Sequence, residues 1–392
     1  MEFESWWLFA IPLFFGLGWF ASRIDQRGLP RHAGPLPDAY FRGLNFLLNE
    51  QPDKAIDAFI DVVKLDPETI DLHFALGNLF RRRGETDRAI RVHLNLAERV
   101  GIDAQQREHA LYELGQDYLK AGLLDRAEDV FNRLEGSHYG PAALRHRLEI
   151  AQMVRDWPLA IELVTRLQQD GERHGRELAH FHCELAASAL ASQDAGRFET
   201  ARRELEAAIA ADAEHPRPRL LAGEVALAEG DAQSALADWQ WVQQRQPAYL
   251  GLLARGWLQA HALLGRDAHG LQVLVDLHRQ QPSVDTFSEI LLALQRQQGA
   301  QAALAWGEQE LRRQPSLLGL EKLLALRVAG TDGEQRAEIE LTQKLIQQQA
   351  RRLARFVCSQ CGFKARQFYW QCPGCARWDS YSPKRTEELE RG

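Results

Sequence analysis

The cysteines near the C-terminus have the spacing of metal ligands. Cys358 and Cys361 form one Cys-x-x-Cys pair, and Cys372 and Cys375 form a second pair after ten intervening residues. Two such pairs on tight turns bring four thiolates into a tetrahedral set, which suits Zn²⁺ or a single iron ion. We therefore predict one tetrathiolate-bound metal ion, iron or zinc. Two disulfides or unligated thiols are the alternatives.

A metal with four cysteine ligands has no open position, so we expect it to be structural rather than catalytic. An iron site that transfers electrons is the alternative to a structural metal. A segment of roughly 36 residues buries too little apolar surface to fold alone, so ligation must supply much of its folding energy. Its aromatic residues are too many for so small a unit to hide, and we expect some to pack on the rest of the protein: Phe356, Phe363, Phe368, Tyr369, Trp370, Trp378 and Tyr381.

The residue after the second cysteine of such a turn often needs a positive φ, which glycine adopts without strain. Gly362 occupies this place in the first pair, whereas Ala376 occupies it in the second. We expect either a different turn or a mildly strained one at Ala376.

The N-terminus contains an uncharged run, Trp6 to Ala21, rich in aromatic residues. A bilayer core asks for about 20 residues, so the run is short but usable with its flanks. A cleavable signal peptide carries positive charge before its apolar run, whereas this chain has acidic residues there. We predict a transmembrane anchor over residues 1–22, with a helix of the globular core as the alternative.

Arg23, Arg27 and Arg31 follow this run, and no lysine or arginine precedes it. The positive-inside rule then places the short N-terminus on the outer side of the membrane and the main domain, from about residue 23 onward, in the cytoplasm. Reduced cysteines in metal spacing agree with a reducing compartment. Residues 23–35, rich in glycine and proline, are expected to form a linker.

The net charge of −7 over 392 residues, with no basic stripe, argues against nucleic-acid binding. The one local basic cluster, Arg351, Arg352 and Arg355, is expected to be a solvated or C-terminal helix face.

The middle of the chain repeats with a basic period of 34 residues. Small residues mark the units, namely Ala55, Ala89, Ala127, Ala160, Ala201 and Ala235. Glycine recurs twelve positions before several of them, and an aromatic residue four positions after. The pattern resembles the tetratricopeptide repeat, a helical hairpin. We predict six clear units over 36–249 and two or three degenerate ones over 250–350.

Small residues at the helix crossing let two helices approach, and an aromatic side chain fills the gap beside them. Because one hairpin cannot bury its apolar stripe, neighbours stack into a superhelix with a concave surface. The predicted fold class is therefore an all-α tetratricopeptide array over 36–350, about eight or nine repeats, with an N-terminal transmembrane helix. A small metal domain follows over 351–392.

No catalytic motif is evident, and we predict that the protein is not an enzyme. His180 and Cys183 share a helix face, but two such groups do not make a metal site, and a partly buried Cys183 is expected. Trp239 and Trp241 are expected in or beside the core. Glu204 and Glu206 are expected on a solvated helix face.

The whole arrangement resembles the lipopolysaccharide assembly protein B (LapB) family of Gram-negative bacteria. The tail resembles the rubredoxin-like tail of that family at Cys358-x-x-Cys361-Gly362-Phe363 and Trp370-Gln371-Cys372-Pro373-x-Cys375-x-x-Trp378. True rubredoxins separate their cysteine pairs further and have glycine after both.

This resemblance implies a single-pass inner-membrane adaptor that restrains lipopolysaccharide synthesis. It would act with the FtsH protease to promote degradation of the deacetylase that commits precursor to lipid A, and a membrane protein that senses lipopolysaccharide would oppose it. It further implies that Cys358, Cys361, Cys372 and Cys375 bind the metal and that the tail docks on the array. A homo-oligomer is possible. A metal-dependent redox carrier or a general scaffold for envelope assembly is the alternative.

Overall fold

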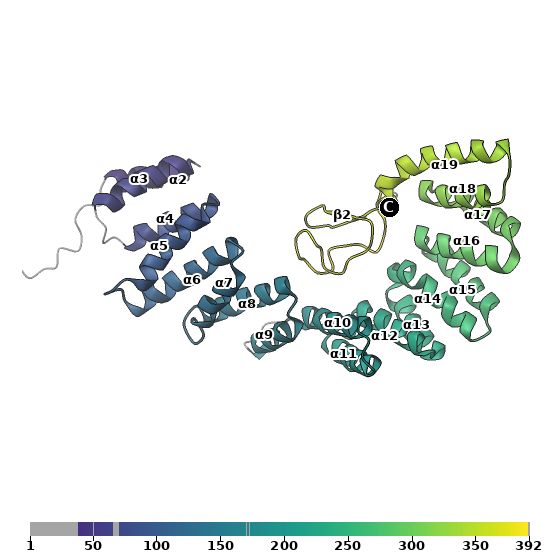
Figure 1. Ribbon diagram of the computed structural model, residues 1–392, viewed down its shortest axis with the longest axis horizontal. Helices are drawn as coiled ribbons and strands as arrows, with labels where there is room; N and C mark the ends of the chain where they lie inside the picture. The colour runs from purple at the N-terminus through teal and green to yellow at the C-terminus, as the bar shows by residue number, and fades with distance from the viewer. Residues whose placement is uncertain (1–37, 50, 66–69, 170, 172, 391–392) are drawn as a thin grey trace, which may run out of the picture. The chain divides into compact units, whose positions relative to one another are not determined.

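The computed structural model describes residues 38–390 except 50, 66–69, 170 and 172, and these are mostly helical (Figure 1). The only strands in this part of the chain are β1 (Phe356–Val357) and β2 (Lys364–Ala365). The helices are α2 (Asp38–Leu48), α3 (Pro52–Leu65), α4 (Ile70–Arg82), α5 (Thr86–Glu98), α6 (Ala104–Lys120), α7 (Leu124–Asn132), α8 (Gly140–Val154), α9 (Trp157–Gln169), α10 (Gly175–Ala191), α11 (Arg197–Ala211), α12 (Pro216–Glu229), α13 (Ala232–Arg245), η1 (Pro247–Tyr249), α14 (Leu250–Leu263), α15 (Asp267–Gln280), α16 (Val284–Gln298), α17 (Ala300–Arg313), α18 (Leu317–Ala329), α19 (Glu334–Leu353) and α20 (Thr386–Leu389).

Successive helices from α2 to α19 pair as antiparallel hairpins, nine within residues 38–353. The predicted helix crossing is visible at Gly115, where a Cβ atom would lie 2.6 Å from the Phe131 ring. Gly43 faces Phe59 and Gly223 faces Trp239 in the same way. A side chain larger than hydrogen would therefore force the two helices of a hairpin apart.

The hairpin turns rely on local chemistry. Gly122 and Gly230 follow the first helix of their hairpins with φ values of 75° and 87°, a left-handed conformation that L side chains avoid. The next helix often begins at a side-chain cap. Asp231, for example, accepts a hydrogen bond from the Ser234 amide at 3.0 Å.

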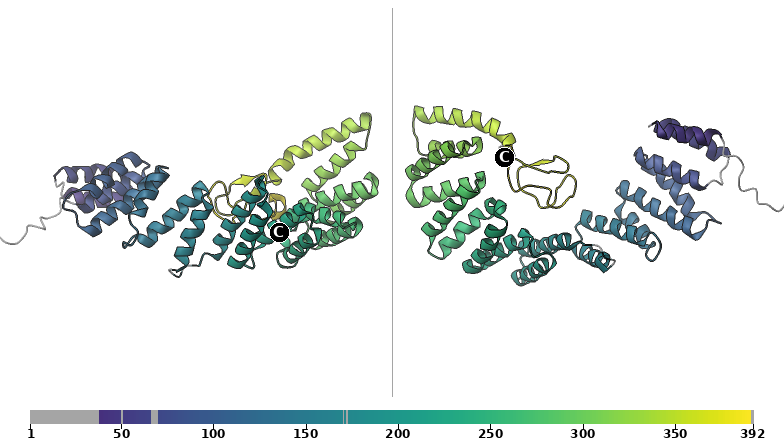
Figure 2. Two further views of the ribbon diagram at one scale, coloured as in Figure 1. Left: turned by 60° about the horizontal axis from the view of Figure 1, so that its bottom comes forward. Right: turned by 180° about the vertical axis from the view of Figure 1, so that it is seen from behind.

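The chain divides between Ala143 and Leu144 into two compact units. The core of the first contains Ala55, Phe59 and Ala89 at repeat positions, together with Leu72. In the second unit the helices follow a curve, and the C-terminal domain lies on its inner side (Figure 1, Figure 2). The domain thus contacts several repeats of its own unit.

The all-α tetratricopeptide fold with a small C-terminal domain is confirmed. The predicted span, Trp6 to Ala21, lies outside the described residues. Among the residues that are described, no helix combines the length and apolar character needed to cross a membrane.

Several predictions about single side chains can be checked. Trp239 is buried in the core and Trp241 packs against it, as predicted. Cys183 is fully rather than partly buried, because small and aliphatic side chains of neighbouring helices close over it. Glu204 also differs from the prediction, since its carboxylate is half-buried and lies 2.9 Å from His182 Nδ1. Glu206 is exposed.

Candidate metal centre

The four cysteines lie on two turns that a short antiparallel ladder holds together. β1 pairs with β2, and isolated bridges link Cys358 to Tyr381 and Gln371 to Trp378. The four sulfur atoms all lie within 4.8 Å of one another. Residues from both ends of the domain therefore converge on one small volume.

The sulfur geometry matches a tetrahedral ion. Cys358 Sγ and Cys375 Sγ are 3.8 Å apart, and Cys361 Sγ and Cys372 Sγ are 3.7 Å apart. A Zn–S bond of about 2.3 Å with tetrahedral angles gives sulfur separations of about 3.8 Å. The cysteines are free, and these separations are far above the roughly 2.05 Å of a disulfide. The donor set fits zinc and iron alike.

The two turns share one backbone pattern. Gly362 N–H donates to Cys358 O at 3.0 Å, and Ala376 N–H donates to Cys372 O at 2.8 Å. Gly362 has a φ of 74° and Ala376 a φ of 55°. The second turn is therefore the same turn with a strained alanine, which resolves the alternative left open by the sequence.

Amide groups point at the sulfurs. Gln360 N–H lies 3.4 Å from Cys358 Sγ, and Gly374 N–H lies 3.3 Å from Cys372 Sγ. Burial would raise the pKa of Cys358, but hydrogen bonds from Ser380 and the turn amides lower it to about 6. The Phe363 amide would lower the pKa of Cys361, yet desolvation and the neighbouring sulfurs raise it to about 12. Four thiolates thus need a cation among them.

The site is unevenly exposed. Cys358 and Cys372 are buried, Cys361 is exposed, and Cys375 is half-buried. Tyr381 is buried beside the sulfurs and donates its hydroxyl hydrogen to Phe363 O at 3.2 Å. One edge of the sulfur cluster therefore reaches solvent.

Two tryptophans of the metal domain insert into the array, as the surplus of aromatic residues predicted. Trp378 Nε1 donates to Gln152 Oε1 of α8 at 3.0 Å, and its ring stacks on His180 with centroids 4.3 Å apart. Trp370 stacks on Tyr249 at 5.3 Å. The Arg217 guanidinium lies 5.6 Å from the Trp370 ring and 5.7 Å from the Trp378 ring, so it contacts both as a cation.

A carboxylate of the metal domain meets two buried histidines of the array. Asp379 Oδ2 lies 2.9 Å from His180 Nε2 and 3.6 Å from His215 Nε2. Arg176 Nε also donates to this oxygen, at 2.5 Å. Burial by itself would raise the pKa of Asp379, but the His180 hydrogen bond and the nearby His215 ring hold it well below its usual range.

These three side chains could in principle hold a second metal ion, because their ligand atoms lie within 4.8 Å of one another. Hydrogen bonds already join these groups. Arg217 Nη1 donates to His180 Nδ1 at 3.1 Å, and the Arg217 amide donates to His215 Nδ1 at 3.2 Å. The Nε2 atoms of the two histidines lie 3.2 Å apart, within hydrogen-bond distance of each other. The cluster is a hydrogen-bonded clasp.

The last residues of the domain bind the ends of array helices. Glu387 accepts from Leu317 N at 2.6 Å and from Ser316 Oγ at 2.9 Å, so it caps the N-terminus of α18. Glu388 accepts from Val284 N at 2.7 Å, at the start of α16. Arg385 forms a two-armed pair with Asp285 at 2.7 and 3.0 Å.

Sequence reasoning identified the four cysteines that lie together in the structure, but not the docking residues. It considered His180 only as a weak metal candidate, and it missed His215, Arg217, Asp379 and Glu387. The surplus of aromatic residues was the one signal for docking. Arg351 and Arg352 lie in the exposed last turn of α19, as expected for a C-terminal helix face.

Residues 356–383 match the rubredoxin metal binding domain family. Residues 42–103 and 187–249 match the tetratricopeptide repeat family. A solved tetratricopeptide repeat protein from Parabacteroides merdae is 12% identical, covers 74% of this chain and 97% of its own, and has a TM-score of 0.27. Fold and site together define a tetratricopeptide-repeat protein with a rubredoxin-type metal domain.

Lipopolysaccharide assembly protein B of Escherichia coli (strain K12) is 34% identical over 381 residues, which cover 96% of this chain and 97% of that protein. The protein of the same name from Haemophilus influenzae (strain Rd) is 27% identical over 394 residues, 96% of this chain and 98% of its own. The chain belongs to the lipopolysaccharide assembly protein B family.

Proposed function

We propose that this protein is a membrane-tethered adaptor that restrains lipopolysaccharide synthesis. In this proposal it brings the lipid A pathway deacetylase to the FtsH protease, and an inner-membrane protein that senses lipopolysaccharide opposes it. The observation that carries the proposal is the likeness, along nearly the whole chain, to proteins named for lipopolysaccharide assembly.

An adaptor role agrees with the architecture. Stacked helical hairpins offer an extended surface for protein segments. Within the described part of residues 38–390, the sulfur cluster and the His180 clasp are the groups of three or more potential metal ligands, and the four cysteines leave no open position of the kind catalysis needs. The cysteines would hold zinc or iron, and binding of the metal would supply folding free energy to a domain too small to fold alone.

The metal domain would shape the binding surface. It contacts α8, α10, α12, α16 and α18, and so links hairpins that are distant in sequence. Fixing these hairpins relative to one another limits the bending expected of a repeat array. A partner segment would then meet a preorganised surface, which lowers the entropic cost of binding.

The deacetylase half-life tests this proposal. In a Gram-negative strain that lacks its own family member, expression of this chain should shorten the half-life of the deacetylase after protein synthesis is blocked. Inactivating FtsH should abolish the effect. A half-life that stays unchanged while the chain is present in the membrane would reject the adaptor role. Affinity capture from membranes should recover protease and client together.

The membrane tether is a separate part of the proposal. A reporter fused near Asp38 should be active only if it works in the cytoplasm, and activity of a periplasmic reporter there would contradict the topology. Replacing residues 6–21 with an unrelated span tests whether the span also binds a partner. We expect membrane attachment to persist and regulation to weaken.

A redox carrier is the second candidate, and the exposure of Cys361 beside the half-buried Cys375 favours it. Iron with a reversible reduction potential in the purified full chain would support this candidate. Zinc, with no redox signal, would reject it.

A further inference from the structure

The outer side of α19 carries a row of exposed residues. Figures 1 and 2 show α19 at the edge of the second unit, as the last helix of the array. Its inner side is packed, since Ala350 and Leu353 lie in one apolar cluster with Val284 and Leu318. The opposite side is exposed along the helix at six residues, which we call the α19 seam: Glu334, Glu338, Leu341, Leu345, Gln348 and Arg352.

The spacing of the seam is that of a helix contact strip. Residues that alternate three and four positions apart form a nearly straight line on a helix, as in a two-stranded coiled coil. The end helix of a repeat array is expected to have a polar outer face, because no further repeat stacks on it. The seam differs at its centre, where Leu341 and Leu345 are 60% and 57% exposed. These two neighbouring apolar side chains favour a contact with another helix.

The seam is symmetric about position 343. Each residue before this position has a counterpart at the same distance after it: Leu341 with Leu345, Glu338 with Gln348, and Glu334 with Arg352. Within the described part of the chain, Glu334, Glu338 and Arg352 form no ion pair. One end of the seam is therefore acidic and the other basic, and both charges are available to a partner.

We propose that the α19 seam binds the same seam of a second copy of this chain, with the two helices antiparallel. A twofold axis then passes beside position 343, so each contact occurs twice. Leu341 packs on Leu345 of the second copy, and Glu334 pairs with Arg352 of the second copy. The six seam residues thus form one self-complementary surface.

Charge complementarity determines both the partner and the orientation. In the antiparallel pair, Gln348 of one copy can donate a hydrogen bond to Glu338 of the other. Parallel helices would instead place each glutamate opposite its own copy, and like charges at such positions repel. A second copy supplies the required charge order without any other protein. Lys344 flanks the centre, and its long side chain can extend from the axis into solvent.

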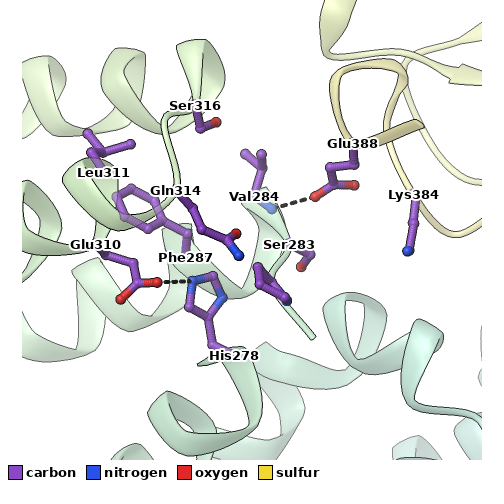
Figure 3. Close-up of a pocket in the computed structure, with 11 residues that line it drawn as sticks. His278, Ser283, Val284, Phe287, Glu310, Leu311, Gln314, Ser316, Lys384 and Glu388 are labelled. Atoms are coloured by element: carbon purple, nitrogen blue, oxygen red, sulfur yellow. Dashed lines mark hydrogen bonds and ion pairs between the residues drawn. The ribbon is translucent and has the colours of Figure 1, made fainter. Parts of the chain in front are cut away.

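The tail holds the C-terminal end of α19 in place. Arg385 Nη1 donates to the carbonyl of Ala354, directly after the helix, at 2.6 Å. In the same segment Glu388 accepts from the Val284 amide at 2.7 Å (Figure 3). The helix is therefore fixed to the array before it meets a partner, which lowers the entropic cost of pairing.

The contact is small, with four leucines and two ion pairs between the copies. We therefore expect a dissociation constant on the order of 10 µM rather than an obligate dimer. Attachment of both copies to one membrane would raise their effective concentration. Self-association of this kind goes beyond the proposed adaptor role and does not depend on it.

Sedimentation of the purified full chain in density-matched detergent micelles tests the proposal. The unmutated chain should change from monomer to dimer as its concentration rises. Glu334→Arg places like charges at both ends of the antiparallel interface, so it should weaken association at least tenfold. Arg312→Glu, on the exposed surface of α17, is the control and should leave association unchanged.

A second substitution identifies the orientation. Glu334→Arg combined with Arg352→Glu in one chain restores opposite charges in the antiparallel pair only, so the double variant should dimerise like the unmutated chain. Mixing the two single variants should give a mixed dimer that is at least tenfold tighter than either variant alone. Leu345→Gln should weaken association without rescue by the charge changes. All these side chains are exposed, and circular dichroism checks that each variant folds.

A monomer at every concentration would overturn the proposal. A dimer that the seam substitutions leave unchanged would overturn it as well, since association would then arise elsewhere, for example in the N-terminal segment. Failure of the double variant to recover would reject the antiparallel arrangement. These measurements use purified protein, so failure of the deacetylase test would leave their result standing.

Discussion

Asp379 lies 2.9 Å from His180 although the two residues are 199 positions apart in the sequence. The pair joins the metal domain to the middle of the array, and Asp379 adopts a φ of 51° to reach it. Aspartate tolerates this left-handed conformation better than most residues. Asp379 thus supplies both the charge that meets His180 and the left-handed backbone conformation that positions this charge.

Asp379→Asn should weaken docking, because asparagine keeps the left-handed preference but cannot accept from several donors with a full charge. We expect a loss of about 1 to 3 kcal/mol in the stability of the second unit. Hydrogen exchange of residues 370–380 and urea unfolding measure it. Asp332→Asn, in an exposed loop, is the matched control, and equal stability of the two variants would contradict the clasp.

Acidification should destabilise the second unit. Burial lowers the pKa of His180 from 6.5 to about 4, and burial likewise lowers the pKa of His278 to about 4. Between these values the unfolded chain binds protons that the folded chain does not, so stability falls as the pH falls from 6.5 toward 4. Each histidine should cost about 2 kcal/mol by pH 5.

Urea unfolding across this range measures the dependence, and His180→Gln should remove about half of it. The low pKa of Asp379 adds nothing in this window, since its contribution is lost only in stronger acid. A His180→Gln variant with the full pH dependence would show that His180 is not a source.

The strained turn predicts a stabilising substitution. Ala376→Gly should raise metal affinity about fivefold, because glycine relieves roughly 1 kcal/mol of left-handed strain. Gly362→Ala, the mirror change in the other turn, should lower it by a similar factor. Competition with a chelator measures both. The two substitutions should change metal affinity in opposite directions. A loss of affinity in both variants would show that the strain is not confined to Ala376.

Loss of a ligand should unfold the metal domain. Structural tetrathiolate zinc is worth on the order of 10 kcal/mol of binding energy in small peptides, so Cys361→Ser or Cys372→Ser should release metal and loosen residues 356–390. Metal analysis and limited proteolysis check this. Cys183→Ser should do neither, because Cys183 lies in an apolar cluster away from the metal.

The array should stay helical in the ligand variants, since neighbouring repeats stabilise one another. If the docked tail shapes the partner surface, these variants should also fail to shorten the deacetylase half-life while remaining in the membrane. A variant without metal that regulates normally would reject the structural role of the metal.

The cap at α18 can be tested independently of the metal. Glu387→Gln keeps the size of the side chain but replaces one acceptor with a donor that faces the Leu317 and Leu318 amides. We expect a loss of about 1 to 3 kcal/mol, as for a charge-assisted hydrogen bond. Urea unfolding measures it, with the exposed Glu390→Gln as control. Identical curves for the two variants would contradict the capping role.

The sequence alone was sufficient for the features that arise within short segments. The four ligands follow from two turns only ten residues apart, and the hairpins follow from glycine, alanine and aromatic positions that recur within one repeat. The strained turn at Ala376 was partly foreseen, because a departure from glycine is visible in the sequence, although its conformation was not.

Only the tertiary structure decided which residues hold the domain to the array. His180, His215 and Asp379 belong to three segments that no repeat rule relates, and Glu387 and Glu388 of the tail bind the first turns of two array helices. The repeat period determines which face of a helix is buried within a hairpin. It does not specify the residues on the face that contacts another part of the chain. Those contacts depend on how the hairpins stack and curve, which is a property of the assembled unit.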